Sequence, residues 1–77
     1  MQIRVNGEER AVESGSTVAR LLEQLDIRGE RVAVELNLEI LDRAVFPTRV
    51  LQPGDQVEII SFIGGGSMTR PSEGARQ

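Results

Sequence analysis

The stretch of sequence that decides the fold reads PGDQVEIISFIGGG and occupies residues 53–66. Its first three residues are typical of a turn, and the residues that follow form the most β-prone run in the chain. Alternation along this run predicts that Val57 and Ile59 face a core, while Ile60 and Phe62 face the opposite way. We therefore expect the central strand of a sheet here, with a glycine triplet directly after it.

A β-hairpin is predicted at the N-terminus. The first residues alternate and end at Asn6-Gly7, which is the strongest short-range hairpin signal. A two-residue loop would set Val5 opposite Glu8, whereas a four-residue loop would set Ile3 opposite Val12 and give a better apolar match. The sequence leaves both registers open.

One amphipathic helix is predicted after the turn and cap residues 14–17. Ser16 or Thr17 is expected to cap its start, and Gly29 is placed to stop it. The helix is indicated by apolar residues at the spacing i, i+3, i+4 and i+7, which are Val18, Leu21, Leu22 and Leu25.

The middle of the chain predicts one further strand and a crossover. Residues 31–36 alternate, residues 37–41 fit either a turn or a short strand, and residues 42–48 are expected to be irregular because they contain a proline. Together the elements make an α+β pattern in which one main helix packs across a mixed sheet. Their order matches the ubiquitin-like β-grasp fold, in which the first and last strands are parallel neighbours at the sheet centre.

Composition excludes several classes of function. The 77 residues suffice for one small domain, and they include neither cysteine nor histidine. This excludes disulfides, zinc sites built on Cys or His, thiol nucleophiles and Ser-His catalytic pairs. A net charge of −3 without a basic stripe argues against nucleic acid as a partner. No stretch reaches the length of a membrane span and no signal-peptide pattern opens the chain, so we expect a cytoplasmic protein with no membrane partner.

We expect three segments along the chain. They are a β-grasp domain over residues 1–63, a flexible glycine arm at Gly64, Gly65 and Gly66, and a disordered tail over residues 67–77. Glycine has no Cβ atom, so an arm of this kind can pass through a narrow channel into a buried active site. Taken alone, the triplet would also fit a plain flexible linker.

Several motifs within residues 1–66 point to one family. The most specific is the block from Gly54 to Ile59 that runs into Phe62-Ile63-Gly64-Gly65-Gly66. The weaker ones are Gln2-Ile3, Asn6-Gly7, Thr17-Val18, Leu21-Leu22, Val32-Ala33-Val34-Glu35, Asn37, Glu39-Ile40 and Arg43. Together they resemble the sulfur carriers of thiamine biosynthesis, the ThiS family.

The resemblance implies a sequence of reactions. An E1-like adenylyltransferase uses ATP to adenylate the C-terminal glycine, and a persulfide relay from a sulfur donor such as a cysteine desulfurase converts it to a thiocarboxylate. Thiazole synthase then takes the sulfur into the thiazole ring of thiamine. By position, Gly66 would bear the thiocarboxylate and Gly65 would be its diglycine partner. The chain would be a protein cosubstrate and not an enzyme, with no bound cofactor and no metal.

The outward-facing residues Ile60 and Phe62 are predicted to form a partner-docking patch, because two apolar side chains stand together beside the root of the arm.

One feature departs from the family pattern. Family members usually stop at the diglycine, whereas Ser67–Gln77 follow here, so Gly66 has an amide where the mechanism needs a free carboxylate. Either a processing protease removes the tail, or the extra residues are foreign to the natural protein, or the protein has drifted from sulfur transfer.

Other functions share these features. Carriers for molybdopterin synthesis, cysteine synthesis or tRNA thiolation, and ubiquitin-like protein modifiers, use the same arm. A non-reactive β-grasp interaction module would use the glycines only as a linker, and its tail would stay intact in the cell.

Overall fold

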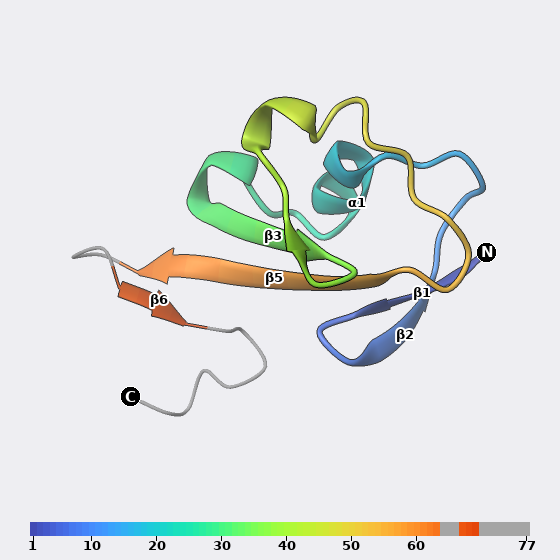
Figure 1. The fold of residues 1–77 in the computed structure, drawn as a ribbon, viewed down its shortest axis with the longest axis horizontal. Coiled ribbons are helices and arrows are strands. Elements are labelled where there is room, and N and C mark those ends of the chain that lie inside the picture. Colours follow the sequence, from blue (N-terminus) through green and yellow to red (C-terminus); the bar gives the residue numbers. More distant parts are fainter. Residues whose placement is uncertain (64–66, 70–77) are drawn as a thin grey trace.

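The centre of the fold is a mixed sheet. The computed structural model describes residues 1–63 and 67–69. In it, β5 (Gln56–Ile63) runs parallel to β1 (Gln2–Val5) on one side and antiparallel to β3 (Val32–Leu36) on the other (Figure 1). The strand order is β2-β1-β5-β3-β4, in which β2 is Glu8–Ala11 and β4 is Glu39–Ile40. A further strand, β6 (Ser67–Thr69), also pairs with β5. This is the α+β arrangement of a ubiquitin-like β-grasp, as predicted, with the first and last strands of the domain paired at its centre.

The first hairpin has the shorter of the two loops considered. β2 (Glu8–Ala11) pairs with β1 so that Val5 lies opposite Glu8, and the register with Ile3 opposite Val12 is wrong. The loop residues Asn6 and Gly7 have φ angles of 51° and 85°, the left-handed conformation that tight hairpin turns require. Turn chemistry therefore outweighs the apolar pairing.

Helix α1 (Val18–Gln24) covers one face of the sheet. Thr17 is its N-cap, because its Oγ1 accepts a hydrogen bond of 3.2 Å from the backbone N–H of Arg20. The prediction that Gly29 stops the helix is wrong: the chain turns at Asp26, which has a φ of 60°.

Gly29 has a different role. It begins a short 3₁₀ helix, η1 (Gly29–Arg31), and a Cβ atom built on it would stand 3.4 Å from the ring of Phe46. That distance is an ordinary van der Waals contact, so the position packs beside the crossover without requiring a glycine.

The segment after β3 combines the two alternatives considered for it. A turn leads into the two-residue strand β4 (Glu39–Ile40), which pairs antiparallel with β3. The crossover then contains a second 3₁₀ helix, η2 (Arg43–Val45), which Asp42 caps by accepting a hydrogen bond of 3.2 Å from the N–H of Ala44.

The core lies between α1 and the facing side of the sheet. Val57 and Ile59 are each only 1% exposed, which confirms the predicted facing of β5. Phe46 is the one aromatic residue among the buried hydrophobics of the described chain, and the core is otherwise aliphatic. Its largest fully buried side chains belong to Ile3, Leu21, Leu36, Leu51, Ile59, Val18, Val34 and Val57.

A short strand follows the glycine triplet. β6 (Ser67–Thr69) pairs antiparallel with the end of β5, with Ile63 opposite Ser67 and Ser61 opposite Thr69. These residues belong to the segment that we expected to be a disordered tail, and the structure differs from that expectation at this strand. The glycine arm at residues 64–66 and the rest of the tail at 70–77 lie outside the described residues, so those predictions stay predictions. Among the helices described, none is long and apolar enough to cross a membrane.

Candidate functional site

The candidate site is the outward face of β5 where the strand approaches the glycine triplet. Ile60 is half-buried there and lies opposite Ala33 of β3. Phe62 is 40% exposed. Both side chains face away from the core, as predicted. Their role in docking a partner remains a prediction.

Backbone hydrogen bonds from β1 hold the first half of β5. The N–H of Arg4 donates to the carbonyl oxygen of Asp55 at 2.9 Å, and the N–H of Asn6 donates to that of Val57 at 2.8 Å. β1 then turns away, and the side chain of Asn6 continues the ladder by accepting a 2.8 Å hydrogen bond from the N–H of Ile59. Sequence reasoning identified Asn6 as a turn residue only and missed this second role.

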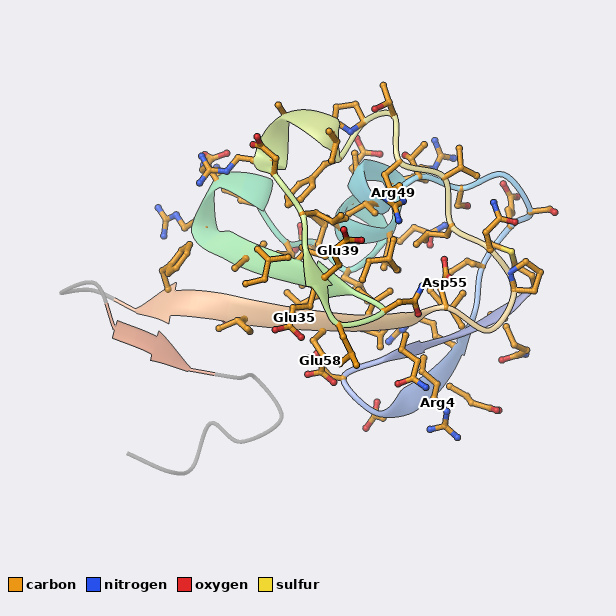
Figure 2. The ribbon with its side chains drawn as sticks, viewed as in Figure 1. Arg4, Glu35, Glu39, Arg49, Asp55 and Glu58 are labelled. Carbon is orange, nitrogen blue, oxygen red and sulfur yellow. The ribbon has the colours of Figure 1, made fainter. Side chains whose placement is uncertain are left out.

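The start of β5 is tied to the second hairpin through a buried carboxylate. Asp55 is 9% exposed, and its two oxygens accept hydrogen bonds from the N–H of Gln52 at 2.7 Å and from Nδ2 of Asn37 at 3.0 Å (Figure 2). Oδ1 of Asn37 in turn accepts a 3.0 Å bond from the N–H of Gln56. Sequence reasoning predicted the turn at Asp55 but missed this link. The one sequence feature that could have indicated the link was an asparagine, Asn37, in a segment that could form a turn.

The outward face beside the apolar residues carries two glutamates, with the exposed Arg4 of β1 on the same face. Glu35 of β3 and Glu58 of β5 lie directly opposite each other, and Ile40 of β4 lies opposite Glu35 (Figure 2). Both glutamates are half-buried. A partner that covers this face therefore meets aliphatic side chains and carboxylates together.

The chain also has a groove on the opposite, helix-covered side of the sheet. Its volume is about 300 Å³, and it is lined by Val5, Asn6, Glu8, Arg10, Leu25, Ile27 and Ile59. In the described part of the chain, no group of three or more metal-ligating side chains is close enough to hold an ion.

The glycines themselves follow β5 without a break in sequence. Gly64, Gly65 and Gly66 come directly after Ile63, the last residue of the strand. The central strand of the sheet, which has neighbours on both sides, therefore leads straight into the predicted reactive segment.

Comparison with known proteins connects this arrangement to a family. The family model described as the ThiS family matches residues 3–66. The chain belongs to the ThiS family. In this ThiS-family chain the matched region runs from Ile3 in β1 through all of β5 and ends at Gly66.

Individual relatives carry the same family name. The chain is 38% identical over 66 residues to the sulfur carrier protein ThiS of Escherichia coli, covering 86% of this chain and all of that protein. The crystal structure of the thiamine biosynthesis protein ThiS from Geobacter metallireducens superimposes with a TM-score of 0.75 at 39% identity, over 86% of this chain and all of that one.

A third relative is much longer. The thiazole synthase of Paramagnetospirillum magneticum is 43% identical over 67 residues, which are 87% of this chain but 21% of that protein. The chain therefore spans about a fifth of this relative.

Proposed function

We propose that this ThiS-family chain is a sulfur carrier of thiamine biosynthesis and that Gly66, as a C-terminal residue, bears the sulfur as a thiocarboxylate. The observation that carries the proposal is the family match, which ends at Gly66 on a domain whose central strand leads directly into the glycines.

The chemistry takes place at the carboxylate of Gly66. That carboxylate attacks the α-phosphate of ATP on an E1-like adenylyltransferase and forms an acyl adenylate with release of pyrophosphate. A persulfide, supplied by a cysteine desulfurase as sulfur donor, then displaces AMP from the acyl carbon. Cleavage of the resulting sulfur–sulfur bond by a second thiol leaves the thiocarboxylate on the carrier. Thiazole synthase accepts the sulfur from it.

The sheet supplies the rigid support for this arm. β5 has neighbours on both sides, and a segment of three residues would span about 10 Å if it were fully extended on a partner. Because Gly64 and Gly65 have no Cβ atom, the segment can enter a channel too narrow for other residues. The carrier is then a cosubstrate: ATP is bound and spent by the partner, and the chain itself needs no cofactor.

Docking is assigned to the outward residues Ile60 and Phe62. They stand on the strand that leads into the arm, so a partner that covers them also receives the glycines. The absence of cysteine supports action in the reducing cytoplasm.

The residues after Gly66 require a processing step. A glycine followed by Ser67 has a peptide amide in place of a carboxylate, so it cannot attack ATP. We therefore include a protease that cleaves between Gly66 and Ser67.

The test compares two lengths of the chain. We expect the chain ending at Gly66, mixed with ATP, its adenylyltransferase and a sulfur donor, to gain the mass of one oxygen replaced by sulfur. The 77-residue chain should gain nothing under the same conditions, because its Gly66 is an amide. Intact-mass spectrometry measures both. Equal charging of the two chains would show that Gly66 is not the reactive residue.

A further inference from the structure

The turn between β3 and β4 exposes a leucine in an unusual conformation. Asn37 and Leu38 have φ angles of 53° and 73°, and the side chain of Leu38 is 91% exposed. A residue with a Cβ atom is uncommon at such a φ, particularly a large one. A large apolar side chain in water at this position contributes nothing to the core.

The first hairpin shows that the fold does not require a leucine in such a turn. Its loop residues Asn6 and Gly7 also have positive φ angles, 51° and 85°, and there the second position is a glycine. Asn-Gly is the pair that turns of this kind prefer. Leu38 therefore stands where a glycine is preferred, although the first hairpin of the same chain does use a glycine there. Such departures from local preference are typical of functional sites.

The turn presents Leu38 from a fixed position. The N–H of Asn37 donates to the carbonyl oxygen of Gln56 at 2.8 Å, and the side chain of Asn37 bonds both the N–H of Gln56 and the carboxylate of Asp55. Because the backbone beside Leu38 is already ordered, a partner loses little affinity to ordering it.

A second exposed residue and a carboxylate lie next to it. Ile40 is 69% exposed, and with Leu38 it forms the pair of most exposed large hydrophobics in the described chain. Ile40 lies opposite Glu35, which lies opposite Glu58. The pair Leu38 and Ile40, named here the Leu38 surface, is therefore an apolar tip bordered by acidic residues.

We propose that the Leu38 surface is a second contact for thiazole synthase, which receives it in an apolar recess bordered by lysine or arginine side chains. The proposal rests on the proposed function for its choice of partner. Charge complementarity to Glu35, which lies opposite Ile40, indicates the basic border. The Paramagnetospirillum magneticum thiazole synthase, which contains a stretch similar to this domain within its own chain, favours the synthase as occupant.

The position of the Leu38 surface separates binding from chemistry. It adjoins Gln56 at the start of β5, whereas the glycines follow the end of that strand. At about 3.3 Å per residue, the strand separates the two regions by about 23 Å. Loss of the Leu38 surface should therefore weaken binding of the synthase without slowing the transfer of sulfur from a bound carrier.

The test uses Leu38→Gly in the chain ending at Gly66. Glycine removes the side chain and relieves the backbone, so the melting temperature should not fall. We expect Kd for the synthase, measured with the uncharged carrier, and KM, measured with the charged one, to rise about tenfold with kcat unchanged.

Val50→Ala is the control, because Val50 is 42% exposed but belongs to the crossover, where it pairs with Thr17 beside α1. Glu35→Gln should weaken binding less and reduce its salt dependence.

Three results would overturn the proposal: unchanged synthase binding by Leu38→Gly, an equal loss in Val50→Ala, or self-association of the wild-type carrier that Leu38→Gly abolishes. Failure of the proposed function is distinguishable from these, because a wild-type chain ending at Gly66 would then remain uncharged. The binding of the uncharged carrier still tests the Leu38 surface in that case.

Discussion

Ile59 and Ile60 are adjacent residues with the same side chain and opposite surroundings. Ile59 is 1% exposed and packs in the core, whereas Ile60 is half-buried on the outward face opposite Ala33. The alternation of side chains along a strand produces this contrast, and it makes the pair a matched test of the facing of β5.

We expect Ile59→Ala to lower the free energy of unfolding by about 2–4 kcal/mol, because it leaves a cavity in a close-packed core. Ile60→Ala removes the same atoms from a partly solvated surface, so its cost should be below about 1.5 kcal/mol. Urea denaturation of both variants measures the difference. Similar losses in the two would mean that both faces of β5 are equally buried.

At the scale of elements, the side chain of Asn6 continues the hydrogen-bond ladder between β1 and β5 past the end of β1. β1 stops pairing through its backbone at Asn6, and Oδ1 of Asn6 then accepts the N–H of Ile59. Without this acceptor, a partly buried donor at the middle of β5 would be left without a protein partner. The hairpin turn and the central strand are therefore joined by one residue.

Replacement of Asn6 separates its two roles. Asn6→Gly keeps the positive φ but loses the acceptor, which should cost about 1–3 kcal/mol and speed hydrogen exchange at the N–H of Ile59. Asn6→Asp keeps both an oxygen acceptor and tolerance of the turn conformation, and its exchange should stay close to that of the wild type. Exchange at Ile59 that is unchanged in Asn6→Gly would contradict the role given to the side chain.

Local patterns predicted the elements well because each depends on neighbouring residues. Alternation placed Val57 and Phe62 on their correct faces, and the spacing of apolar residues located α1. The bond between Asn6 and Ile59 joins residues 53 positions apart, and no local pattern encodes it. Gly29 was misassigned because the chain leaves the helix earlier, at Asp26, whose positive φ no local pattern indicated.

At the scale of the whole molecule, the two faces of the sheet have different neighbours. One face packs against α1 (Figure 1), while the other presents Ile60 and Phe62 from β5 and Ile40 opposite Glu35. Stability should therefore depend mainly on the first face and recognition on the second. In the sequence, the glycines directly follow the strand that both faces share.

Phe62→Asp tests this division. Because Phe62 is 40% exposed, the variant should fold with a melting temperature close to that of the wild type. Its affinity for the adenylyltransferase should fall by at least about tenfold, since a carboxylate would be desolvated in an apolar contact. Val45→Asp, at 37% exposure in η2, is the control, and titration calorimetry measures both. Unfolding of Phe62→Asp would place Phe62 in the core and the docking surface elsewhere.

The parallel pairing of β1 with β5 has a consequence for synthesis on the ribosome. A nascent chain in which β5 has not yet been made lacks the strand between β1 and β3. It therefore cannot assemble the sheet, even when all the preceding strands have emerged from the ribosome. Because β5 immediately precedes the glycines, a polypeptide released early within this strand should stay unfolded and be degraded by cellular proteases. Under the proposed function, chains truncated within β5 should therefore not accumulate as folded competitors that lack Gly66.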